Sequence, residues 1–346
     1  HRHGETFRQP AIIIANHLSM IDLLIMFSLS PDIVVTAKSW VIRNPLFALI
    51  TKFAGFIDTS KGVEQMEQTM TAIVAQQQSL LIFPEGTRSD DLEMQRFHKG
   101  AFYLAEHYHL DIVPIVLYGT GNVYRKGQLY LANGTMVTEV LPRIACNDAR
   151  YGTTYQERAK QIRRYMAAEY DKLRAAYDTM DNAYYRTAFD KNYLYKDVRV
   201  ARMERRVARQ NQYYRWLDAL VPRQAAICET DCGYGEKSFV LLLLSPQRTA
   251  VAFDVDAEKV AFAAHGTLTQ NRARFVCADA SAAELPPSNV FIINDYSDEL
   301  FAQCAAGLET DGKIIVMKNG KNHLPTAAGF VITDNPFAWI CTRETI

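Results

Sequence analysis

Short β-rich runs alternate with helical patterns in two separate parts of this 346-residue chain. In the first part, up to about residue 170, runs rich in valine and isoleucine follow one another with helical patterns between them. These runs read "AIIIAN", "DIVVTAK", "SLLIFPEG" and "DIVPIVLYG". Parallel strands need long crossover connections, usually helices, so the alternation predicts an α/β domain with a largely parallel sheet.

The second alternation begins after Pro222 and continues to the end of the chain. Its runs read "AAICET", "TAVAFDV", "RARFVCAD", "NVFIINDY" and "KIIVMKNG", followed by "GFVITD" and "FAWICTRE". Asn335 and Pro336 alone separate the last two runs, which favours an antiparallel hairpin. Strands with crossovers and a closing hairpin predict a second, doubly wound sheet.

Helical patterns without strand signals connect the two alternations. Residues 155–180 form a long amphipathic pattern, and residues 181–220 are rich in tyrosine and arginine. We therefore predict two α/β domains, 1–175 and 223–346, joined by a helical linker, 176–222. The length of the chain also exceeds what a single core usually organises.

Charge and cysteine usage narrow the classes of function. Lysine plus arginine number 38, as do aspartate plus glutamate, so net charge gives no reason to expect a nucleic-acid partner. The six cysteines lack the paired spacing of metal ligands, and we expect reduced core residues and no metal. No apolar run reaches the roughly 18 residues of a membrane span. Because the chain begins with histidine, we expect it to be part of a longer polypeptide.

A polar cluster interrupts the first apolar run. The stretch "AIIIANHLSMIDLLIMF" carries Asn16, His17, Ser19 and Asp22. The strand should end near Asn16, which leaves His17 in the turn before a helix that Ser19 helps to start. The Asp22 carboxylate then accepts the Nδ1 proton of His17 and leaves Nε2 free as a base. On these residues alone, a buried histidine satisfied by a carboxylate is an equal alternative.

The stretch "LLIFPEGTRSD" supplies further polar residues at the end of another buried strand. Gly86 lets the backbone turn, and Arg88 offers a planar fork to an anion. Together with the histidine and aspartate above, a strand that ends in Pro-Glu-Gly-Thr-Arg is more specific than either piece alone. The combination favours a catalytic site.

These motifs resemble those of the glycerolipid acyltransferases, the PlsC-like family that includes lysophosphatidate acyltransferases. The resemblance covers about residues 5–145. "NHLSMID" is similar to the family's Asn-His-x-x-x-x-Asp signature, which implies that His17 is the general base and Asp22 its orienting partner. "FPEGTRS" is similar to the phosphate-site block, and "RFHKGA" to a flanking block. They imply an acceptor site formed by Glu85, Gly86, Thr87, Arg88 and Lys99.

The resemblance implies transfer of a fatty acyl group from an acyl-coenzyme A or acyl carrier protein thioester to a hydroxyl or amine of a lysolipid or related lipid. A lipid acceptor implies a peripheral position at the cytoplasmic face of a membrane. Residues 41–56 have a composition suited to a headgroup boundary or to packing on their own sheet. One departure concerns the acceptor, because "GFIDTSKG" has Thr59 where the family often has an arginine, with Lys61 as the nearby cation.

The second alternation carries a glycine turn and acidic strand ends. In "AAICETDCGYGEKSFVLLLL", Gly233 and Gly235 follow a strand and precede an apolar helix, which lets a ligand approach the backbone and the helix N-terminus. Asp254 ends the next strand about twenty residues on, where a carboxylate binds ribose hydroxyls. Asp279 ends a third strand, placed to reach an adenine amino group.

This order of motifs resembles the class I S-adenosylmethionine-dependent methyltransferases over about residues 223–346. It implies a Rossmann-like sheet with S-adenosylmethionine at Gly233, Gly235, Asp254 and Asp279. Lys237 replaces the usual third glycine, so a domain that has lost catalysis is an equal alternative. Methyl transfer as the main activity and a non-catalytic lipid-binding module are the rival functions. The arginine-rich stretch 199–209 is suited to anionic headgroups or to a solvated face.

Overall fold

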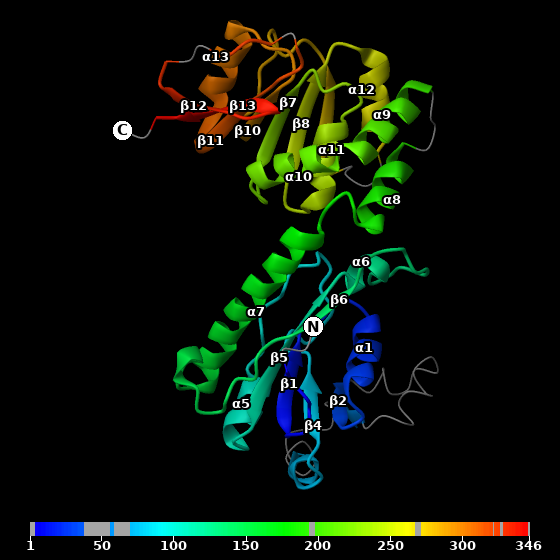
Figure 1. The fold of residues 1–346 in the computed structure, drawn as a ribbon, viewed down its shortest axis with the longest axis vertical. Helices are drawn as coiled ribbons and strands as arrows, with labels where there is room; N and C mark the ends of the chain where they lie inside the picture. The colour runs from blue at the N-terminus through cyan, green and yellow to red at the C-terminus, as the bar shows by residue number, and fades with distance from the viewer. Residues whose placement is uncertain are drawn as a thin grey trace. The chain divides into compact units, whose positions relative to one another are not determined.

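The computed structural model describes residues 4–37, 56–58, 70–193, 198–266, 271–320, 322–325 and 328–344. The chain divides into two compact units, His1–Tyr177 and Asp178–Ile346. Each unit is built on one β-sheet with helices packed against it (Figure 1). The predicted α/β class is therefore confirmed for both units.

The sheet of the first unit has the strand order β3-β2-β4-β1-β5-β6. Its strands are β1 (Ala11–Ala15), β2 (Ile33–Ala37), β3 (Phe56–Asp58), β4 (Ser79–Ile82), β5 (Asp111–Tyr118) and β6 (Val137–Val140). β1 pairs in parallel with β4 and β5, and β2 with β3 and β4, whereas β6 runs antiparallel to β5. The four predicted strands are confirmed, but the sequence pattern does not predict β3 or the edge strand β6.

Helices cover both faces of this sheet (Figure 1). They include α1 (Ile21–Leu29), α5 (Gly100–His107), the short α6 (Thr120–Val123) and α7 (Tyr155–Tyr177), which is the predicted long helix. Successive side chains of a strand point to opposite faces, so Ile12 joins a core with Phe102 of α5, while Ile13 joins another with Leu23 of α1. All of β1 is buried, as expected at the centre of a parallel sheet that is covered on both faces.

The sheet of the second unit has the strand order β12-β13-β11-β10-β7-β8-β9. Its strands are β7 (Ala226–Thr230), β8 (Thr249–Asp254), β9 (Ala273–Cys277), β10 (Ser288–Ile293), β11 (Leu308–Met317), β12 (Phe330–Asp334) and β13 (Ala338–Arg343). β7 to β11 pair in parallel, and β12 and β13 form the predicted antiparallel hairpin. The strand order reverses between β7 and β10, which is where such sheets bind ligands.

Helices α8 (Ala183–Asn192), α9 (Val198–Arg209) and α10 (Asn211–Leu220) belong to the second unit, together with α11 (Glu236–Leu244), α12 (Ala257–Ala264) and α13 (Asp298–Gly307). The first three lie within residues 176–222, the predicted helical linker. Phe189 of α8 and the buried Tyr193 contact Phe239 of α11 through their rings. These helices therefore add to the core of the second unit.

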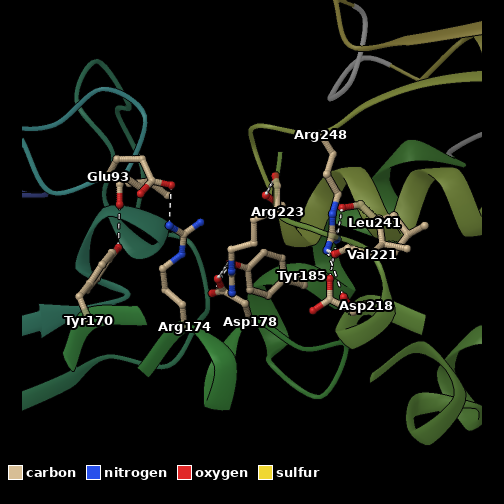
Figure 2. Close-up of polar contacts among 12 residues, drawn as sticks. Glu93, Tyr170, Arg174, Asp178, Tyr185, Asp218, Val221, Arg223, Leu241 and Arg248 are labelled. Carbon is tan, nitrogen blue, oxygen red and sulfur yellow. Dashed lines mark hydrogen bonds and ion pairs between the residues drawn. The ribbon is translucent and has the colours of Figure 1, made fainter. Parts of the chain in front are cut away.

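Arginines connect loops to helices within each unit (Figure 2). In the first unit, Arg174 Nη1 of α7 lies 2.5 Å from Glu93 Oε1. In the second unit, the guanidinium of Arg248 donates to the carbonyls of Leu241 and Pro222 and to the Asp218 carboxylate. Arg248 is only 1% exposed, so its polar partners lie in the interior of the unit.

All six cysteines are free thiols. The prediction of core residues is confirmed for Cys228, Cys232, Cys304 and Cys341, which are buried. It is wrong for Cys277, which is exposed because β9 lies at the edge of its sheet, and for the partly exposed Cys146, which lies in a loop after β6. Over the described residues, no helix combines the length and the apolar character that crossing a bilayer requires.

Candidate active site

The side chain of Asn16 fixes the end of β1 to its neighbour β5. Its Nδ2 donates to the carbonyl of Leu117 at 2.9 Å, and its Oδ1 accepts the Leu117 backbone N–H at 2.7 Å. Asn16 is fully buried, so an unmade bond here would be costly. The two bonds set the point where the chain leaves the sheet and delivers His17 to its carboxyl edge.

His17 and Asp22 form the predicted pair. His17 Nδ1 lies 2.8 Å from Asp22 Oδ2, and the same oxygen accepts the backbone N–H groups of Leu18 and Ser19 at 2.7 Å each. Because α1 begins at Ile21, His17 precedes the helix, as this contact requires. An ionised carboxylate has no hydrogen to donate, so the proton of the first bond belongs to Nδ1.

The second ring nitrogen of His17, Nε2, is available as a base. Within the described part of the chain it has no hydrogen-bond partner, and the His17 side chain is 15% exposed while that of Asp22 is fully buried. The imidazole also stacks on Phe83, with the ring centroids 4.2 Å apart. Stacking and the Nδ1 bond together hold the ring in one orientation.

Glu85 connects the histidine to the loop that follows β4. Its Oε1 accepts the backbone N–H of His17 at 3.0 Å, and its Oε2 accepts that of Gln95 at 3.0 Å. Glu85 is only 4% exposed. The motif resemblance implies that Glu85 belongs to the acceptor site, whereas in the structure its carboxylate bonds to backbone N–H groups of His17 and Gln95.

Burial raises the pKa of Glu85 to about 7, and the charge of Asp22 acts in the same direction. The two backbone N–H bonds and Arg163 oppose this shift without cancelling it. Between its ordinary pKa of 4.5 and about 7, the folded protein therefore holds the Glu85 proton more tightly than the unfolded chain does. Stability should consequently fall as the pH rises through this window.

We expect the free energy of unfolding of the wild type to lose up to about 1.4 kcal/mol per pH unit in that window through Glu85. Glu85→Gln should remove this part of the slope, although it will lower stability at all pH values because an amide nitrogen would face one of the N–H donors. Urea unfolding at several pH values measures the slope. Glu106→Gln, at an exposed position of α5, is the control, and equal slopes for Glu85→Gln and wild type would contradict the assignment.

The turn after Glu85 presents a cation, Arg88, at the same sheet edge. Gly86 has a φ of +71°, and its N–H donates to the Phe83 carbonyl at 3.0 Å, which closes the turn. Thr87 is exposed and Arg88 is partly buried. Ser89 N–H donates to the His17 carbonyl at 2.9 Å, so Arg88 directly precedes a residue bonded to the histidine backbone.

Within the described residues the Arg88 guanidinium forms no hydrogen bond and no ion pair. Lys99 is a second cation near this turn: it is exposed and directly precedes α5. The neighbouring His98 donates its N–H to the Pro84 carbonyl at 2.7 Å, which attaches this segment to the turn. Thr59 and Lys61, as well as most of the stretch 41–56, lie outside the described residues. Among the described histidine, cysteine, aspartate and glutamate residues, no group of three or more is arranged to hold a metal.

The glycine turn of the second unit lies between β7 and α11. The φ angles are +60° at Gly233 and +73° at Gly235, and Asp231 also has a positive φ of +50°. A Cβ on Gly235 would lie 2.5 Å from Cε1 of Phe275, so only glycine fits there. The turn therefore requires glycine at position 235, and Asp231 is a further strained position that the sequence pattern does not reveal.

Asp254 at the end of β8 contacts this turn. Its Oδ2 accepts the Gly233 N–H at 2.7 Å, and its Oδ1 accepts the Asp256 N–H at 2.9 Å. Asp279 follows β9, is exposed, and accepts the N–H and hydroxyl of Ser281. The structure thus brings Gly233 and Asp254 together and places Asp279 at the end of the adjacent strand.

Several carboxylates gather at this edge. Partial burial of its carboxyl group, and then the charges of Asp295, Asp254 and Asp279, raise the pKa of Asp231 to about 6. Oxygen acceptors at strand ends suit the hydroxyl and amino groups of a nucleoside. These residues therefore fit the adenosyl part of S-adenosylmethionine, and binding of that cofactor stays a prediction.

Comparison with known proteins matches residues 1–118 to the family model described as Acyltransferase. A 1-acyl-sn-glycerol-3-phosphate acyltransferase of Limnanthes alba is 35% identical over 151 residues, which cover 42% of this chain and 54% of that protein. The chain spans about half the length of the curated relatives it matches. These matches confirm the resemblance to glycerolipid acyltransferases that the motifs predict.

Solved structures of two kinds are similar to the chain. The 1-acyl-sn-glycerophosphate acyltransferase PlsC of Thermotoga maritima has a TM-score of 0.43 at 18% identity, and the alignment covers 48% of this chain and 67% of that one. A putative methyltransferase of Escherichia coli has a TM-score of 0.33 at 19% identity, with coverage of 39% and 85%. The strand order of the second sheet, with its antiparallel closing hairpin, is itself the predicted Rossmann-like arrangement.

Proposed function

We propose that the first unit transfers a fatty acyl group from an acyl thioester to a hydroxyl or amine of a lysolipid or related lipid acceptor. The observation that carries the proposal is the His17–Asp22 pair, which follows β1. Arg88 follows the adjacent strand β4, and neither His17 Nε2 nor the Arg88 guanidinium has a polar partner among the described residues. A base with its own carboxylate activates a nucleophile, and a nearby cation orients an anionic substrate. The family match of residues 1–118 supports acyl chemistry.

In this mechanism, His17 Nε2 takes the proton from the acceptor hydroxyl or amine as that group attacks the thioester carbonyl carbon. An ester or amide bond forms, the carbon–sulfur bond breaks, and the proton passes from His17 to the departing thiolate of coenzyme A or acyl carrier protein. Asp22 stabilises the imidazolium while the proton is held. The Ser19 hydroxyl donates to the Tyr124 carbonyl at 2.7 Å, which supports direct transfer without an acyl-serine intermediate.

The acceptor end of the site is formed by the turn after β4. Arg88 would bind an anionic group such as a phosphate with its planar fork, and Lys99 would add charge from the neighbouring segment. Thr87 lies exposed beside them, and Gly86 allows the turn that presents them. Glu85 would act as a positioning residue, since its carboxylate holds the His17 backbone.

The test is incubation of the full chain with acyl-coenzyme A or acyl-carrier-protein thioesters and a panel of lysolipids, with products followed by mass spectrometry. We expect an acylated lipid and one equivalent of free thiol, each dependent on both substrates. Thiol release without acceptor would indicate a hydrolase instead. Binding of the thioester without turnover would favour the lipid-binding module, and either result would contradict the proposal.

The loop of residues 124–136 is suited to contact with a membrane surface. It exposes Leu129, Tyr130 and Leu131 by 96%, 62% and 69%. Contiguous exposed apolar side chains of this kind mark interaction sites, and Arg125 and Lys126 at the start of the loop complement anionic headgroups. The loop begins beside the turn that carries His17 and Ser19, because the Tyr124 carbonyl accepts the Ser19 hydroxyl. We therefore assign the loop to a phospholipid surface that holds the acceptor.

Replacing Leu129 and Leu131 with serine should weaken co-sedimentation with phosphatidylglycerol-containing vesicles at least about tenfold, because both side chains would lose apolar burial in the interface. Transfer to a short-chain, water-soluble acceptor should stay at the wild-type rate. Leu324→Ser, at a residue of the second unit that is 53% exposed, is the matched control. Unchanged vesicle binding of the double variant would overturn the assignment of this loop.

In the second unit, the glycine turn, Asp254 and Asp279 would hold the adenosyl part of S-adenosylmethionine, which would supply a methyl group when bound. The carboxylate of Asp254 is already ordered by two backbone N–H groups, and each of its oxygens keeps a lone pair for a ribose hydroxyl. Calorimetric binding of the cofactor that is lost in Asp254→Ala would support methyl transfer as the rival function.

A further inference from the structure

A cavity of about 570 Å³ opens in the second unit beside the β7–β10 switch point. Its volume lies in the range of ligand-binding sites. It reaches from the glycine turn at Gly233 to the ends of β10 and β11, at Asn294 and Met317, and to the turn of the closing hairpin at Phe337. The predicted ribose and adenine carboxylates, Asp254 and Asp279, do not line it.

Positive side chains dominate the wall of this cavity. They come from four separate parts of the unit, namely Arg199, Arg202 and Arg206 of α9, Lys237 of α11, Lys259 of α12 and Lys318 after β11. The acidic side chains on the wall are Asp231 and Glu236. Glu236 is already neutralised by an ion pair with Arg206. The described wall therefore carries an excess of positive charge.

Three arginines on one face of α9 line the cavity. Val200, Met203 and Val207 are buried on one side of this helix, in the core of the unit. Arg199, Arg202 and Arg206 recur at the same helical spacing, one position before each buried residue, and line the cavity. From sequence alone, this arginine series is suited either to anionic headgroups or to a solvated face.

Most of these cations have carboxylate partners outside the cavity. Arg199 pairs with Glu258 at 3.2 Å and Lys318 with Asp334 at 2.5 Å. These carboxylates are 69% and 71% exposed, and pairs of this kind contribute little to stability, so a ligand can replace them. Arg202 forms no hydrogen bond or ion pair with any described residue, which leaves its whole fork for a ligand.

We propose that this cavity binds a phosphoryl-bearing anion through Arg202 and the neighbouring cations of its wall. A phosphoryl group accepts bidentate bonds from a guanidinium and further charge-assisted bonds from lysines. S-adenosylmethionine carries a sulfonium, an ammonium and a single carboxylate but no phosphoryl group, so it offers one anionic group and two cationic groups to a wall that is mainly cationic. The phosphoryl group belongs either to a soluble ester or to a lipid headgroup, and both sources present the same chemistry.

The test is calorimetric titration of the full chain with sodium pyrophosphate and, in parallel, co-sedimentation with phosphatidate vesicles. All proteins carry Arg88→Gln together with Leu129→Ser and Leu131→Ser, so that neither the cation nor the exposed apolar loop of the first unit contributes. We expect Arg202→Gln to weaken binding about tenfold, equivalent to about 1.4 kcal/mol. Arg205→Gln is the matched control: it removes the same charge from the same helix, but Arg205 is exposed and does not line the cavity.

Each outcome decides the proposal. If Arg202→Gln loses pyrophosphate binding but keeps vesicle binding, the ligand is a soluble ester. If it loses vesicle binding but keeps pyrophosphate binding, the ligand is a lipid headgroup. Equal losses in Arg202→Gln and Arg205→Gln would show non-specific attraction and overturn the site. Absence of both kinds of binding would overturn it as well. Binding of S-adenosylmethionine that depends on Arg202 would show that the arginine holds the carboxylate of the cofactor instead.

Discussion

Replacing His17 with alanine is expected to lower kcat/KM for acyl transfer by about 10²- to 10⁴-fold, the range that general bases contribute. The loss follows from geometry, because no other described side chain occupies the place of Nε2 on a ring held by Asp22 and Phe83. The fold should persist, since the His17 side chain adds a partly exposed ring to an otherwise complete core. The measurement is initial rate with saturating thioester and the best lysolipid acceptor.

Asp22→Asn keeps the histidine in the site and tests what its carboxylate partner contributes to catalysis. The amide keeps the size of the carboxylate but has no charge to stabilise the imidazolium and no preference for the Nδ1–H tautomer. We expect a loss of similar size in kcat with little change in KM. His107→Ala, which removes an exposed histidine of α5, should leave the rate unchanged. Full activity of His17→Ala would refute the mechanism, and a loss in the control would point to general damage.

The local part of this site is predictable from sequence. His17 and Asp22 are five positions apart, and one strand-to-helix turn is enough to bring them together. The bonds that position the histidine join distant parts of the chain: Glu85 to the His17 N–H over 68 positions, and Asn16 to Leu117 over 101. Their partners are backbone atoms, which every residue carries. No pattern of residue types therefore reveals them.

The fold likewise has elements that the local sequence pattern predicts and elements that it does not. β1 and β5 are predictable because continuous apolar runs mark strands that are buried on both faces. β6 is a half-buried edge strand of the sequence "VTEV", and nothing in this pattern distinguishes it from a loop. The arginines of α9 show a further limit, since helical spacing gives their common face but not the cavity that this face meets.

Arg248→Met should lower the free energy of unfolding of the second unit by about 3–5 kcal/mol, the cost of removing one partner from a buried ion pair. Figure 2 shows the guanidinium among its partners. Nε donates to the Pro222 carbonyl at 3.0 Å, Nη1 to Asp218 Oδ1 at 2.5 Å and to the Leu241 carbonyl at 3.0 Å, and Nη2 to the Val221 carbonyl. Methionine fills the volume but leaves these acceptors without donors.

Urea unfolding followed by tryptophan fluorescence measures this loss in a Trp40→Phe background, because the two remaining tryptophans, Trp216 and Trp339, both lie in the second unit. Arg215→Met is the matched control: Arg215 pairs with Asp181 at 2.7 Å, but both side chains are about half exposed, so the change should stay below about 0.5 kcal/mol. Arg248→Lys keeps the charge without the planar fork and should fall between wild type and methionine. It gives a measurable protein if Arg248→Met fails to fold. Equal midpoints for wild type, Arg248→Lys and Arg215→Met would contradict the stabilising role of the buried Arg248 guanidinium.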